Sequence, residues 1–134
     1  MKKKNTLLAI GILLLSTVIM FSACKKKSSD TTTVNPPTFS LSATVDPNNT
    51  ANLLFYISCS TDNVKMTRID IKDPINSGIP PVDLQGMTML KNENYYLTTS
   101  YTKELGTWTF TFTGNRSSDN SGFVSYASMN VTGK

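Results

Sequence analysis

The chain has 134 residues, enough for one domain, and a formal net charge of +4 at pH 7. It contains no histidine, which excludes Ser-His-Asp and Cys-His catalytic sites and removes the commonest metal ligand. The charge does not indicate a nucleic-acid binder, because six lysines fall within residues 1–27. Residues 38–134 hold seven basic and eight acidic residues, so this part has a net charge of −1.

The first residues have the layout of a secretory signal peptide. Three lysines at positions 2–4 precede an apolar run from Leu7 to Phe21. A membrane-spanning helix needs about 20 apolar residues, and this run is shorter. The sequence therefore predicts a cleaved leader rather than a permanent transmembrane segment.

The leader ends in Phe21-Ser22-Ala23-Cys24, which resembles the lipobox of bacterial lipoproteins. The resemblance implies cleavage after Ala23, so that residues 1–23 are removed, and a diacylglyceryl group on the thiol of Cys24. A membrane is then a partner through the lipid anchor. Lys25 stands where an aspartate retains lipoproteins in the inner membrane of enteric bacteria, which implies the outer membrane. Whether the protein faces the periplasm or the cell surface stays open.

Residues 24–37 join this cysteine to the rest of the chain. The segment KKKSSDTTTVNPP has one aliphatic residue and no aromatic, which predicts a disordered, flexible tether. Its Asp30-Thr31-Thr32 resembles the short site at which some Bacteroidota attach O-glycans, and this resemblance makes Thr31 a candidate glycosylation site.

Apolar and polar residues alternate from Phe39 to Val45, which predicts a half-buried strand. The residues 46–49 have turn chemistry. A second strand follows, and one of its faces carries Leu53, Phe55, Ile57 and Cys59. We therefore expect the thiol of Cys59 inside the domain.

A third strand changes its phase. Val64 and Met66 share one phase, whereas Ile69 and Ile71 have the other. Either a bulge near Thr67–Arg68 or a misread register explains the change.

Apolar residues also recur at every second position in the second half of the domain. Residues 73–86 predict an irregular connection with a short edge segment at Val82–Leu84, because they contain three prolines and two glycines. A strand is expected to begin at Met87. The remaining predicted elements are a strand from Tyr95 to Tyr101, a strand over 107–113 with Trp108, Phe110 and Phe112 on one face, a polar loop over 114–122 and a last strand over 123–132.

About seven such strands in residues 38–134 predict an all-β, antiparallel β-sandwich. The strand order and the segment GTWTFTFTGN before a polar loop and a last strand resemble the closing hairpin of immunoglobulin-like bacterial modules. That resemblance implies an Ig-like domain over 38–134.

The sequence favours no catalysis. Glu93, Glu104, Asp70 and Asp73 lie near predicted turns or strand ends, and the pattern places no pair of them on one concave surface. Loop oxygens near Asp46 and Asp62 lack the acidic clustering of a calcium site, so neither a metal nor a cofactor is expected. An enzyme would need convergent carboxylates in a cleft.

Three tyrosines, Tyr56, Tyr96 and Tyr126, fall opposite the strongest apolar faces and are candidate ligand-binding aromatics. The first hypothesis is a non-catalytic, lipid-anchored cell-envelope protein that presents an Ig-like domain for protein–protein interaction or adhesion. The alternative is a carbohydrate-binding accessory lipoprotein of a polysaccharide-uptake system. Partners are thus another envelope protein or a glycan, and no nucleic acid.

Overall fold

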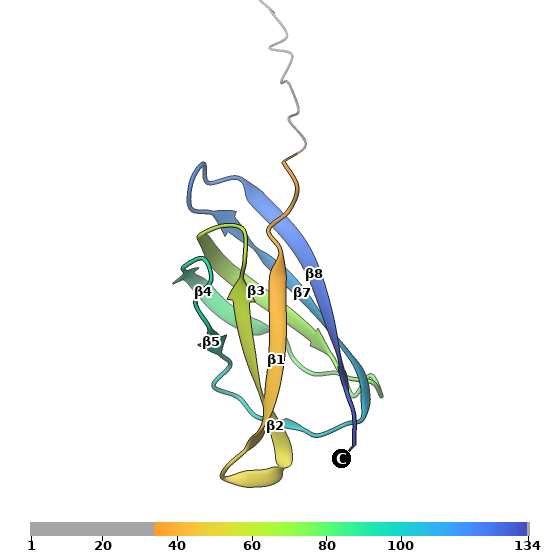
Figure 1. The fold of residues 1–134 in the computed structure, drawn as a ribbon. Helices are drawn as coiled ribbons and strands as arrows, with labels where there is room; N and C mark the ends of the chain where they lie inside the picture. The colour runs from red at the N-terminus through yellow and green to blue at the C-terminus, as the bar shows by residue number, and fades with distance from the viewer. Residues whose placement is uncertain (1–33, 134) are drawn as a thin grey trace, which may run out of the picture. The chain divides into compact units, whose positions relative to one another are not determined.

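A computed structural model describes residues 34–133 of the chain, which form eight strands in two antiparallel sheets (Figure 1). Within this range there is no helix, and so none that could cross a membrane. The prediction of an all-β fold with two antiparallel sheets is confirmed. The predicted leader, Cys24 and Thr31 lie outside the described residues.

The two sheets have four strands each. The first sheet comprises β1 (Phe39–Asp46), β2 (Asn49–Cys59), β5 (Tyr95–Tyr96) and β6 (Tyr101–Thr102), with β1 on one side of β2 and the two short strands on the other. The second sheet has the order β4 (Val82–Met89), β3 (Val64–Lys72), β7 (Gly106–Arg116) and β8 (Gly122–Val131).

Aromatic side chains from both sheets meet in the core. The Phe55 ring from β2 lies 4.9 Å from that of Trp108 and 5.1 Å from that of Phe110, measured between ring centroids. Phe39 stacks on Phe112 at 4.2 Å. These contacts follow from the period-two patterns, which direct alternate side chains inward. The thiol of Cys59 is fully buried and free, as expected.

The bulge in the third predicted strand is present. The register of β3 against β7 shifts between Met66 and Arg68, so Thr67 is an extra residue there; against β4 the register shifts at the same place, but the extra residues belong to β4. Because a one-residue insertion inverts the facing of every later side chain, Val64 and Met66 are buried together with Ile69 and Ile71.

Three predicted elements differ from the structure. The edge segment and the strand expected from Met87 are one strand, β4, which continues through a bulge at Gln85–Gly86. The strand expected from Tyr95 to Tyr101 is interrupted, because only its two ends pair with β2. The predicted loop over 114–122 is shorter, since Gly114 and Asn115 pair with β8.

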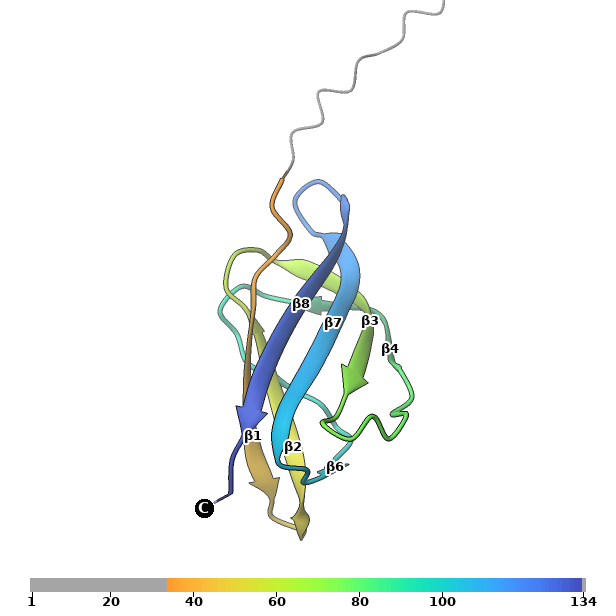
Figure 2. The ribbon, with the colours of Figure 1, turned by 90° about the vertical axis from the view of Figure 1, so that its right-hand side faces the viewer.

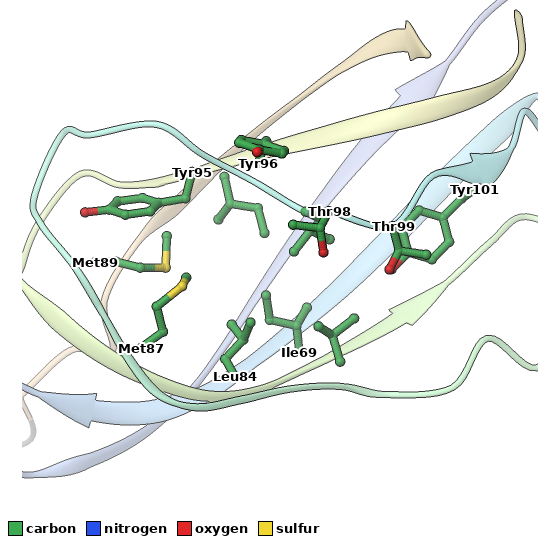
Figure 3. A pocket seen from close by; sticks show the side chains of 12 residues that line it. Ile69, Leu84, Met87, Met89, Tyr95, Tyr96, Thr98, Thr99 and Tyr101 are labelled. Atoms are coloured by element: carbon green, nitrogen blue, oxygen red, sulfur yellow. The ribbon is translucent and has the colours of Figure 1, made fainter. Parts of the chain in front are cut away.

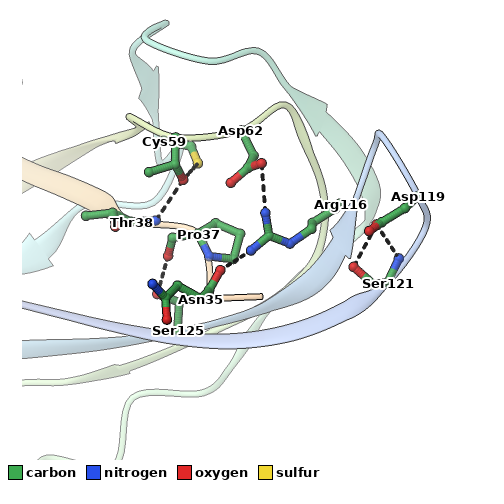
Figure 4. Close-up of polar contacts among 10 residues, drawn as sticks. Asn35, Pro37, Thr38, Cys59, Asp62, Arg116, Asp119, Ser121 and Ser125 are labelled. Atoms are coloured by element: carbon green, nitrogen blue, oxygen red, sulfur yellow. Dashed lines mark hydrogen bonds and ion pairs between the residues drawn. The ribbon is translucent and has the colours of Figure 1, made fainter. Parts of the chain in front are cut away.

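The folded part of the chain begins before residue 38, where the sequence placed the end of the tether. Pro37 is fully buried, and its carbonyl accepts a hydrogen bond of 2.6 Å from the Ser125 hydroxyl (Figure 4). The carbonyl of Asn35 accepts from the guanidinium of Arg116. Two polar partners on β7 and β8 therefore hold a segment that composition alone assigned to the tether.

Candidate functional site

One side of the sandwich is closed and the other is open. Strands β1 and β8 lie next to each other on the closed side (Figure 2). On the opposite side, β4 and the short strands β5 and β6 belong to different sheets and do not pair. A pocket of about 100 Å³ lies on this open side.

The pocket is apolar. Figure 3 shows Met87, Met89 and Tyr95 at one end, with Thr99 and Tyr101 at the other. The aliphatic and thioether side chains that line it are Ile57, Ile69, Val82, Leu84, Met87, Met89 and Leu97. No charged side chain is among its lining residues in the described chain.

The polar groups that line the pocket are the hydroxyls of tyrosine and threonine side chains. Burial raises the pKa of Tyr101 above its ordinary value, so this hydroxyl keeps its proton. The Tyr95 hydroxyl accepts a 2.8 Å hydrogen bond from the Leu90 N–H and donates one of 3.1 Å to Glu93. Thr98 and Thr99 supply the remaining hydroxyls. The pocket therefore suits an uncharged, mainly apolar group.

Apolar surface continues outside the pocket. Met87 is 38% exposed and Tyr96 is 61% exposed, and both line the pocket. Leu90, bonded to the Tyr95 hydroxyl, is 44% exposed. Methionine and aromatic residues are enriched at the centres of protein–protein interfaces. Below, "the open-side patch" means Met87, Leu90 and Tyr96 together with this pocket.

The three predicted tyrosines do not form one platform. Tyr56 and Tyr96 are register partners in the first sheet, and their ring centroids are 6.3 Å apart. Tyr126 lies on β8 in the second sheet, in register with Thr111 of β7, and is 75% exposed. Of the three, Tyr96 alone lines the apolar pocket.

Sequence reasoning missed most of this pocket. Its lining comes from β2, β3, β4 and the segment from Tyr95 to Tyr101, which are far apart along the chain. Within its own strand, each of these apolar residues has the pattern of an ordinary core residue. The signal available in the sequence was the phase of Tyr96, which falls opposite the apolar face of its own strand.

Two carboxylates share one depression, which the sequence analysis did not expect. Asp73 and Glu104 both line a hollow of about 390 Å³ beside Trp108 and the segment 99–102. Hydrogen bonding by Ser77 lowers the pKa of Asp73, so this carboxyl is ionised at neutral pH. A glycosidase acid needs the opposite shift. Asp73 therefore does not meet the requirement for the acid of such a pair.

The loop carboxylates considered for calcium have partners within the protein. Asp46 accepts a 2.9 Å hydrogen bond from the Asn48 N–H, and Asp62 pairs with Arg116. Within residues 34–133 there is no group of three or more His, Cys, Asp or Glu side chains that could hold a metal ion.

Searches of protein-family models, of curated proteins and of solved structures found no significant match to this chain.

Proposed function

We propose that this chain is a non-catalytic lipoprotein of the outer membrane whose β-sandwich, of the immunoglobulin-like type, binds another envelope protein through the open-side patch. The lipobox resemblance at Cys24 supports the anchor. The observation that supports the binding role is the apolar pocket lined in part by exposed Met87 and Tyr96, with exposed Leu90 next to the buried Met89 in the chain. A contiguous apolar patch on a secreted domain typically marks an interaction surface.

The absence of histidine and the lowered pKa of Asp73 favour a binding role over catalysis. Without histidine the chain lacks the side chain that most often acts as a general base near neutral pH, and a carboxyl with a lowered pKa is a weak general acid and a weak general base there. The domain's near-neutral charge likewise favours recognition by apolar contact rather than by charge.

Glycan capture is the second candidate function, and Tyr126 is the observation that favours it. Its ring is largely exposed on a face where Thr109, Thr111 and Ser128 supply hydroxyls around a shallow hollow. A flat aromatic ring beside hydrogen-bonding groups can stack on a sugar. Loss of binding to neutral oligosaccharides in a Tyr126→Ala variant, with a Tyr96→Ala variant as control, would support this alternative.

Site-specific photo-crosslinking in native membranes tests the protein-binding proposal. A benzoylphenylalanine introduced in place of Tyr96 should give a discrete crosslinked protein that mass spectrometry identifies. The same group in place of Tyr126, on the other sheet, is the matched control. The proposal fails when neither position crosslinks, or when position 126 gives the same product at equal yield.

A further inference from the structure

We propose that the pocket in the open-side patch receives one uncharged aliphatic side chain of the partner protein, and that the partner does not bind by adding a β-strand. This inference rests on the proposed function and adds the chemistry of the partner. Four observations carry it: the size of the pocket, the charge of its lining, the apolar surface outside it and the interrupted strand edges around it.

The size of the pocket selects a small group. An apolar cavity of about 150 Å³ lined by aliphatic and aromatic side chains binds benzene. The present pocket is about 100 Å³, and the four-carbon side chains of leucine and isoleucine are smaller than benzene. One such side chain therefore fits, whereas an indole ring does not.

The lining selects an uncharged group. Ile69, Leu84 and Met89 form walls that cannot solvate an ion, and Tyr101 remains protonated. Moving an unpaired charge into such surroundings costs far more than an aliphatic contact returns. Lysine, arginine, aspartate and glutamate side chains are thereby excluded.

The surface outside the pocket selects a protein rather than a free small molecule. A ligand confined to the pocket would leave Leu90 and most of Tyr96 in water, where they already stand 44% and 61% exposed. A partner surface covers them while one of its side chains fills the pocket. This is the arrangement of an interface hot spot, in which a buried anchor is surrounded by contacts that exclude water.

The edges beside the pocket oppose strand addition. In β4, Gln85 and Gly86 have positive φ values of 48° and 81°, and three residues there face Thr67 alone. The Asp83 carboxylate also accepts a hydrogen bond of 3.0 Å from the Gln85 N–H. Across the opening, β5 and β6 are two residues long each. Bulged and very short edges are poor templates for a further strand.

Methyl NMR tests the pocket without its natural partner. The secreted form of the chain, with Cys24→Ser to avoid detergent, is labelled with [methyl-¹³C]methionine. On titration with N-acetyl-leucinamide, the Met87 and Met89 methyl signals should shift, while those of Met66 and Met129, which do not line the pocket, should not. N-acetyl-lysinamide should shift none of the four. Equal shifts with both probes, or none with either, overturn the inference.

A blocking variant links the pocket to the partner. Leu84→Phe fills the pocket from β4, and Val124→Phe is a matched control on the exposed face of β8. Leu84→Phe should lower the crosslinking yield at position 96 by about tenfold or more, as expected for loss of an anchor contact, while Val124→Phe should leave it unchanged. Undiminished crosslinking in Leu84→Phe overturns the inference and leaves the proposed function standing. Leucinamide binding without any crosslinked protein instead overturns both the proposed function and the protein occupant.

Hydrogen exchange separates a side-chain anchor from an added strand. A partner strand would slow exchange of the amides of β4, because it would supply them with new hydrogen bonds. The inference predicts no such slowing over residues 82–89 in the crosslinked complex. Strong new protection there would show an added strand and overturn this part of the proposal.

Discussion

Arg116 and Asp62 form an ion pair across 54 positions of the chain, with 2.8 Å between Nη1 and the carboxylate oxygen (Figure 4). Arg116 ends β7, and Asp62 lies in the turn after β2. The Arg116 side chain is only 9% exposed, and its second terminal nitrogen donates to the carbonyl of Asn35. One guanidinium thus joins both sheets to the segment that enters β1.

Removing this guanidinium should destabilise the domain. Arg116→Ala deprives both the Asp62 carboxylate and the Asn35 carbonyl of their donor. We expect a loss of about 2 kcal/mol, less than for a fully buried pair because Asp62 retains some contact with water. That corresponds to a fall of about 10 °C in the melting temperature. Arg68→Ala is the control, since the Arg68–Asp70 pair is exposed and should contribute less than about 1 kcal/mol. Equal losses in both variants would contradict the assignment.

A methyl group at Gly114 should disrupt the second sheet. A Cβ atom there would lie 2.3 Å from the backbone oxygen of Lys65 in β3, and a backbone oxygen cannot rotate away. We expect Gly114→Ala to cost about 3 kcal/mol or more in chemical denaturation. Gly122→Ala is the matched control in the partner strand, because its nearest neighbouring atom is 4.0 Å away. A Gly114→Ala domain as stable as the control would show that β3 and β7 do not approach as described.

Stability should fall in acid. Hydrogen bonds from Ser77 lower the pKa of Asp73, and those from Ser121 lower the pKa of Asp119. A carboxyl with a lower pKa in the folded state stabilises the fold above its unfolded pKa, about 3.9. The contribution disappears as the pH falls through the folded value. The melting temperature should therefore fall less between pH 7 and pH 2 in an Asp73→Asn, Asp119→Asn double variant than in the wild type. Parallel profiles would contradict the prediction.

The proposed anchor can be tested at one atom. Cys24→Ser removes the thiol that the lipobox resemblance assigns to the diacylglyceryl group, so the protein should move from the membrane to the soluble fraction. The mass of the wild-type product should also exceed that of the peptide chain by the attached lipid. Cys59→Ala is the control, because that thiol is fully buried and should not affect the fractionation. A processed Cys24→Ser protein, lacking residues 1–23, that stays in the membrane fraction would disprove the anchor.

Local alternation was sufficient to predict much of the fold. The inward direction of Phe55 and Trp108 follows from the period-two pattern alone. The change of phase between Met66 and Ile69 indicated the bulge. The pairing of Gly114 with Phe123 could not be predicted from the sequence, because Gly114 and Asn115 are residue types that also favour turns. The break between β5 and β6 was hidden by an unbroken alternating pattern from Tyr95 to Tyr101.

The candidate site was much less predictable than the fold. Tyr96 was identified from its phase, but its relation to Met87 depends on how the two sheets face each other. That arrangement is set by packing between residues far apart in the sequence, which a local sequence pattern does not show. For the same reason the sequence could not show that Tyr126 lies on a different sheet from Tyr56 and Tyr96.

The hold on Asn35 and Pro37 has a mechanical consequence. The segment enters the domain at one end, whereas the chain leaves β8 at the other (Figure 1). A force applied between Pro37 and the end of β8 would run along β1, whose hydrogen bonds to β2 lie across that direction. Such bonds break together rather than one after another, which makes the sandwich suited to resist pulling.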